Sequence, residues 1–185
     1  YGTVRYDGLL RPVLRASGSS VNARSVVSLS EYDGWGRLIK EWNPVPVDGM
    51  ECPSVIALKS TAAATYADDC PYTLMEYLGT PTDSVVRLTG PGQDWHTNAK
   101  GKVMEAWMNE SSGALSCRKY AVAADGSLSA LGTWPMGSLR VAVVTDEDGR
   151  TVSTFTDGEG RIVLERRDVN ADTYYIYAVS YTHLR

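Results

Sequence analysis

The chain has 185 residues, of which 43% are hydrophobic and 22% charged, and its formal net charge is -4. A composition of this kind predicts one folded domain and argues against a disordered chain. The mildly acidic balance lacks the surplus of lysine and arginine with which proteins neutralise phosphates, so we do not expect nucleic acid as a partner. No apolar run approaches the roughly 20 residues that a membrane-spanning helix needs.

The first part of the chain predicts β-hairpins, followed by a loop and a helix. Residues 1–43 indicate two hairpins, and the stretch 43–49, which is rich in turn formers, is typical of a loop. Apolar residues at helical spacing follow over 54–66, where Ser54 can cap the first turn and Pro71 prevents continuation. We expect this short helix to be the only one and to pack against the sheet.

From residue 72 onward the pattern is again that of β-strands. Strand-forming runs occupy residues 74–78, 84–88, 102–107, 116–122 and 139–145. Turn formers at 125–128 and 132–135 indicate a further hairpin. No stretch marks a domain boundary, so we expect one mainly β segment of tandem antiparallel hairpins over residues 1–178, with a single short helix near 54–66.

The last seven residues, 179–185, resemble a translated sequencing adapter. We therefore exclude them from the interpretation of the fold and expect the native chain to continue past Ala178. His183 falls within this stretch, which leaves His96 as the only native histidine.

One short pattern occurs four times, at residues 6–13, 32–39, 145–152 and 156–163. Its shared core is Tyr or Thr, Asp, two variable residues, Gly and Arg, followed by β-formers. An aspartate side chain can accept a hydrogen bond from the backbone two residues later, and glycine readily adopts a positive φ. Each copy therefore predicts a tight turn between two strands. The turn residues are Asp7, Asp33, Asp146 and Asp157 with the glycines Gly36, Gly149 and Gly160. In the first copy Leu10 stands where the others have glycine, and we expect a turn of another type there.

These tandem Tyr-Asp-x-x-Gly-Arg units resemble the YD repeats of bacterial Rhs-type proteins. Residues 71–73, 90–96 and 172–177 are similar to the N-terminal repeat region of one Rhs subgroup, so the resemblance covers most of 1–178. It implies a sheet that spirals into a hollow β-shell, secreted or on the cell surface, which presents or encloses a C-terminal toxin in competition between bacteria. The core motif of the family's self-cleavage site is absent from this chain. We expect the repeat arginines to bridge neighbouring hairpins; they are Arg11, Arg37, Arg150 and Arg161.

The chain carries none of the common catalytic or metal-binding motifs. It contains no nucleophile elbow, no phosphate loop, no calcium loop and no paired-cysteine zinc motif. We therefore expect no enzyme activity, no cofactor and no bound metal. Cys52, Cys70 and Cys117 are expected to be free thiols, with a bridge between Cys52 and Cys70 as the alternative, and His96 is expected to be a loop residue that bonds backbone or water.

Five tryptophans and eleven tyrosines could also stack on sugar rings. Trp35 and Trp107 lie at repeat and strand positions that favour packing, whereas Trp42 and Trp134, beside proline-containing loops, are candidate sugar contacts. Two functions follow from the sequence. The first is a non-catalytic segment of a shell wall, with neighbouring repeats and an enclosed toxin domain as partners. The alternative is a module that binds surface carbohydrate through exposed aromatic side chains.

Overall fold

The computed structural model describes residues 2–19, 24–49, 53–80, 82–123, 125–168 and 171–177. The expected adapter at 179–185 and Cys52 therefore lie outside the described residues. The chain divides into two compact units, Tyr1–Lys102 and Val103–Arg185. None of the helices within the described ranges is long and apolar enough to cross a membrane.

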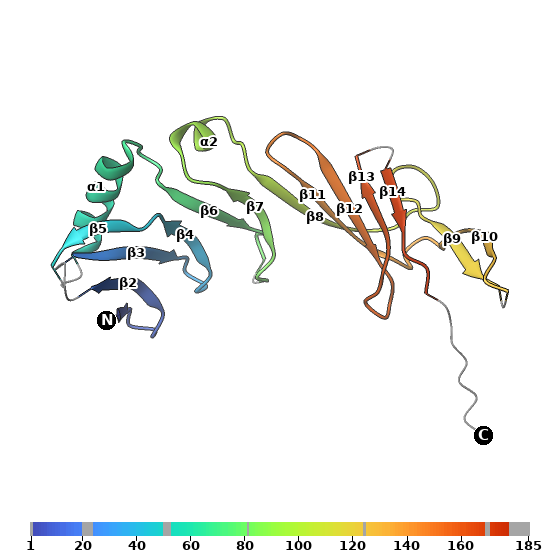
Figure 1. Cartoon of the computed structure of the whole chain (residues 1–185), viewed down its shortest axis with the longest axis horizontal. Helices are drawn as coiled ribbons and strands as arrows, with labels where there is room; N and C mark the ends of the chain where they lie inside the picture. Colours follow the sequence, from blue (N-terminus) through green and yellow to red (C-terminus); the bar gives the residue numbers. More distant parts are fainter. Residues whose placement is uncertain are drawn as a thin grey trace, which may run out of the picture. The chain divides into compact units, whose positions relative to one another are not determined.

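The described part of the first unit is built on seven antiparallel strands (Figure 1). They are β1 (Gly2–Tyr6), β2 (Pro12–Ser19), β3 (Arg24–Tyr32), β4 (Leu38–Trp42), β5 (Val45–Asp48), β6 (Tyr72–Tyr77) and β7 (Val85–Thr89). The order across the sheet is β1-β2-β3-β4-β6-β7, and β5 pairs with β3. Consecutive strands are neighbours except where β5 and the helix intervene between β4 and β6. The expectation that 43–49 is a loop is wrong, because Val45–Asp48 pairs with β3 as a strand.

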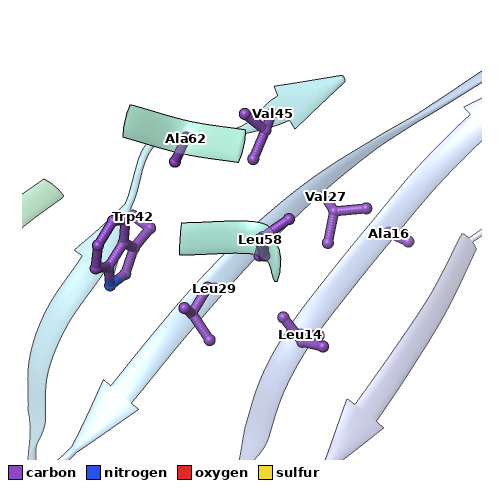
Figure 2. Packing of buried hydrophobic residues seen from close by; sticks show 8 residues of the cluster. All are labelled: Leu14, Ala16, Val27, Leu29, Trp42, Val45, Leu58 and Ala62. Carbon is purple, nitrogen blue, oxygen red and sulfur yellow. The ribbon is translucent and has the colours of Figure 1, made fainter. Parts of the chain in front are cut away.

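The predicted helix over 54–66 is confirmed as α1 (Val55–Tyr66). The Ser54 hydroxyl accepts from the Ala57 N–H at 3.2 Å, and the helix ends at Ala67 in a left-handed conformation. Figure 2 shows how its buried face closes the core of the first unit. The residues of this core are Leu14, Ala16, Val27, Leu29, Trp42, Val45, Leu58 and Ala62.

The expectation of a single helix is wrong, because α2 (Gln93–Thr97) follows the Gly-Pro-Gly stretch. This one turn is too short for a hydrophobic period to reveal, and the Asp68 carboxylate fixes its start by accepting from the Gln93 N–H at 2.9 Å. His96 lies in this helix and not in a loop. Its Nε2 donates to the Tyr72 carbonyl oxygen at 3.3 Å, so it bonds backbone as expected.

The second unit contains one antiparallel sheet and one separate hairpin within its described residues. The strands of the sheet are, in order, β8 (Lys102–Met108), β11 (Arg140–Thr145), β12 (Thr151–Thr156), β13 (Ile162–Arg167) and β14 (Ala171–Tyr174). The hairpin pairs β9 (Arg118–Val122) with β10 (Leu128–Thr133). A second core lies on this sheet and consists of Cys117, Leu139, Val141, Phe155, Val163 and Leu164. The prediction of a mainly β chain with antiparallel strands is confirmed.

Candidate functional site

All four copies of the repeat fold into the same turn. The Asp N–H donates to the Arg carbonyl at 2.9–3.0 Å, and the N–H at the glycine position donates back to the Asp carbonyl at 3.0–3.1 Å. One oxygen of each Asp carboxylate also accepts from the N–H groups two and four residues later, at 2.8–3.0 Å. The four aspartates, Asp7, Asp33, Asp146 and Asp157, therefore close their turns as predicted.

The first copy does not form a different type of turn, so that expectation is wrong. Leu10 has a φ of 61° and makes the same backbone hydrogen bond to Asp7 that glycine makes in the other copies. The aspartate and Arg11 hold this turn closed although leucine resists the left-handed region. Leu10 is 82% exposed, so nothing in the core compensates the strain.

Leu10→Gly is expected to stabilise the chain by roughly 0.5–1 kcal/mol. Removal of the left-handed strain gains about 1–2 kcal/mol, and the added freedom of glycine in the unfolded chain takes back about half of it. Urea unfolding followed by circular dichroism measures the change. Leu9→Gly is the matched control, since Leu9 is also exposed but has no positive φ, and it should destabilise. A loss of stability in Leu10→Gly would contradict the claim that the backbone of Leu10 is strained.

Gly149→Val is expected to destabilise the chain by about 1–2 kcal/mol. Gly149 has a φ of 82°, and a Cβ built on it meets no atom within 4 Å, so the cost comes from the backbone alone. Gly158→Val is the control, because its Cβ would also meet open space and its φ is not positive. Equal melting temperatures for the two variants would contradict the claim that the positive φ at position 149 requires glycine.

Three of the four turns carry an ion pair between the Asp and the Arg of the repeat. The Arg Nε donates to the second carboxylate oxygen at 2.7 Å for Arg11, 2.8 Å for Arg37 and 2.9 Å for Arg161. Burial alone would raise the pKa of the Asp157 carboxyl, but the hydrogen bonds from the Arg161 backbone and side chain outweigh it and hold this pKa below its usual value.

Each of these three ion pairs is covered by a tyrosine that lies in the next strand of the sheet, or for Tyr177 just after it. The guanidinium carbon lies 4.7, 4.5 and 5.1 Å from the centroid of the tyrosine ring. The tyrosine hydroxyl donates to the carbonyl oxygen of the residue after the arginine at 3.0, 2.8 and 3.0 Å. We call each set a clasp. The clasps are Asp7, Arg11 and Tyr32; Asp33, Arg37 and Tyr77; and Asp157, Arg161 and Tyr177.

Strand register explains why the tyrosines lie there. The pairing of β2 with β3 places Leu14 opposite Leu29, and continuing it three residues places Tyr32 opposite Arg11. The β4–β6 and β13–β14 pairings place the other two tyrosines opposite their arginines in the same way. The clasp therefore joins the turn of one hairpin to the strand that returns beside it.

The second clasp makes further contacts with the β6–β7 loop. Arg37 Nη1 donates to the carbonyl oxygens of Thr80 and Thr82 at 3.0 Å each. The guanidinium also lies 4.4 Å from the ring centroid of Trp35. Arg37 thus holds its own turn and the loop of the next hairpin together.

The third copy of the repeat lacks the clasp. Within the described residues, no ion pair joins Arg150 to Asp146 and no aromatic ring covers Arg150.

The two candidate sugar contacts differ in exposure. Trp42 is 7% exposed, its ring centroid lies 4.8 Å from that of Tyr72, and its Nε1 donates to Glu31 at 2.5 Å. It is a core residue, and we do not retain it as a sugar contact. Trp134 is half-buried and packs against the second core, with Lys119 Nζ 4.8 Å from its ring. Trp107, which the sequence assigns to packing, is 53% exposed.

Cys70 and Cys117 are free thiols. Burial raises the pKa of the Cys117 thiol to about 11, which keeps it protonated and unreactive near neutral pH.

A family model described as a domain of unknown function (DUF6443) matches residues 3–108. This range contains the first two clasps. Among curated proteins, no match to the chain is found.

Proposed function

The chain belongs to the family described as a domain of unknown function (DUF6443), and we propose for it a structural role as a non-catalytic segment of an Rhs-type YD-repeat protein. In this proposal the parent protein is secreted or displayed on the cell surface. The segment builds part of a β-shell wall that presents or encloses a C-terminal toxin. Its partners are neighbouring repeats and the enclosed toxin domain.

The observation that carries this proposal is the recurrence of the clasp. Three times, the recurring aspartate and arginine of the repeat contact each other and a tyrosine that lies beside them. A repeat that uses its charged and aromatic residues to lock one hairpin on the next favours assembly of an extended wall. The same residues are then not available to a substrate, which supports a non-catalytic role.

Sequencing of the uninterrupted reading frame in the source DNA tests this function. We expect further Tyr-Asp-x-x-Gly-Arg units and a divergent C-terminal domain in the same frame. A frame that holds no further repeats would overturn the proposal.

A second candidate function, binding of surface carbohydrate, is favoured by a groove in the second unit. This groove has a volume of about 770 Å³ and is lined by Trp107 and Glu105 from β8, and by Thr151 and Ser153 from β12. An exposed indole beside a carboxylate and hydroxyls offers a sugar both a stacking face and hydrogen-bond partners.

A glycan array separates the two candidates. Saturable binding that is lost in Trp107→Ala and kept in Trp35→Ala would favour the carbohydrate module, since Trp35 is also exposed but lies outside this groove. The shell proposal expects no saturable glycan ligand.

A further inference from the structure

The groove in the second unit has a floor built from one row of side chains that crosses the sheet from β8 to β14. Strand register places Glu105 of β8 opposite Val143, and Val143 opposite Ser153. Ser153 is in turn opposite Arg166, and Arg166 is opposite Asp172 of β14. Residues opposite one another point to the same face of an antiparallel sheet. All five line the groove, so its floor carries charged side chains on both sides.

The positive charge of this row is already neutralised. Arg166 Nε and Nη2 donate to the two carboxylate oxygens of Asp172 at 2.7 Å each. The Nη1 of the same arginine donates to the carbonyl oxygens of Ala114 and Ser116. The pair of Arg166 and Asp172 is therefore neutral as a whole, and it gives the groove no attraction for an anion.

Two further carboxylates in the groove have no cationic partner in the part of the chain that the structure describes. They belong to Glu105 and Asp168, and both residues are exposed. One oxygen of Asp168 accepts from the Thr151 N–H at 3.1 Å, which leaves its charge unpaired. The charged lining residues are Glu105, Arg166, Asp168 and Asp172. Three carboxylates and one guanidinium give the groove a formal charge of -2, so charge complementarity favours a cationic ligand.

The uncharged part of the groove suits a sugar. Trp107 lies two residues after Glu105 on the same face of β8, and its indole is 53% exposed. Among the described residues, the hydroxyls of Thr151 and Ser153 have no hydrogen-bond partner and are open to a ligand. An indole can pack on the apolar face of a sugar ring, and the hydroxyls can exchange hydrogen bonds with those of the sugar. A neutral sugar would use these groups and leave the negative charge uncompensated.

The two unpaired carboxylates lie too far apart for one cation. Glu105 is on β8 and Asp168 directly follows β13, with β11 and β12 between them. Three strand spacings separate the two positions, which amounts to roughly 14 Å. A ligand that satisfies both must therefore carry positive charge at more than one point along its length.

We infer that this groove binds an oligomer of an amino sugar whose amines are free and protonated. One sugar ring stacks on Trp107 with its ammonium group against Glu105, and the ammonium group of a later sugar reaches Asp168. This inference rests on the second candidate function, binding of carbohydrate, and adds the charge that the carbohydrate carries.

Isothermal titration calorimetry with two tetramers tests the inference on the 185-residue chain. One is the β-1,4-linked tetramer of glucosamine, and the other is its fully N-acetylated counterpart, which has the same rings and linkage but no positive charge. At about pH 6 the carboxylates are ionised and the amines protonated. We expect the free-amine tetramer to bind roughly tenfold more tightly, since each exposed ion pair adds up to about 1 kcal/mol.

Three variants assign the preference to the groove. Glu105→Gln should weaken binding of the free-amine tetramer roughly fivefold and leave the acetylated one unchanged. Trp107→Ala should weaken both roughly tenfold, because both stack on the indole. Asp148→Asn is the matched control: it removes an exposed carboxylate of the same unit outside the groove, and neither tetramer should respond. All three side chains are exposed, so each variant should unfold at the same urea concentration as the unaltered chain.

Equal affinity for the two tetramers, or a loss of free-amine binding in Asp148→Asn as large as that in Glu105→Gln, would overturn the inference. If the two tetramers bind equally and Trp107→Ala abolishes both, the carbohydrate function stands and the preference for a cationic sugar alone is wrong. If neither tetramer binds, the inference is wrong, and the glycan array then decides whether the carbohydrate function fails with it.

Discussion

Trp42→Ala is expected to lower the free energy of unfolding of the first unit by about 3–5 kcal/mol. The indole is 7% exposed and lies in the core that α1 closes with its own Leu58 and Ala62 (Figure 2). The substitution leaves a cavity where the ring was. It also removes the donor to Glu31, a half-buried carboxylate that would keep only Lys59 as its side-chain partner.

Urea unfolding followed by far-ultraviolet circular dichroism measures this loss. Trp35→Ala serves as the control, because Trp35 is 60% exposed and its one described ring contact is with Arg37. That variant should lose under about 1 kcal/mol. Similar losses in both variants would contradict the placement of Trp42 in the core and reopen its assignment as a ligand contact.

Asp157→Ala is expected to destabilise the second unit by about 2–3 kcal/mol. The carboxylate is 8% exposed, accepts from the N–H groups of Glu159 and Arg161, and pairs with the Arg161 guanidinium. Its removal orphans both N–H groups and frees the arginine from the third clasp.

Asp146→Ala is the matched control for this effect. Asp146 accepts the same two backbone hydrogen bonds at 2.9 Å but has no ion pair with Arg150. Its loss should cost about 1 kcal/mol, the usual value for a side chain that closes a turn or cap. The difference between the two variants measures the clasp, and equal losses in thermal unfolding would show that the clasp adds nothing.

The turns could be predicted from the sequence because their chemistry is local. The aspartate of each repeat and the residue at the glycine position lie within one five-residue turn, and the hydrogen bonds that close the turn stay inside it. Leu10 shows the limit of the argument. Its side-chain preference opposes the turn, but the bonds from Asp7 and Arg11 outweigh that preference.

The tyrosines of the clasps could not be found in the same way. Their hydroxyl bonds span 20, 39 and 15 residues, so no fixed period marks them. Only the register of the paired strands brings each ring opposite its arginine. Tyr77 shows this most clearly, since α1 and β5 lie between it and Arg37 in the chain.

The sequence also could not predict which tryptophan side chains are exposed. Trp42 and Trp107 both occupy strands, and the strand pattern does not reveal which face another element covers. The helix α1 covers Trp42, whereas the face of β8 that carries Trp107 forms part of an open groove. Trp42, a candidate sugar contact in the sequence analysis, is therefore in the core, and Trp107, which the sequence assigns to packing, is exposed.

A double-mutant cycle between Arg37 and Tyr77 tests the central claim most directly, namely that the clasp joins successive hairpins. The unfolding free energies of the unaltered chain, Arg37→Gln, Tyr77→Leu and the double variant would be compared. We expect a coupling of about 0.5–2 kcal/mol. A parallel cycle with Arg15→Gln, an exposed residue of the non-adjacent strand β2, should be additive. A coupling between Arg37 and Tyr77 that does not differ from that of the parallel cycle would contradict the claim.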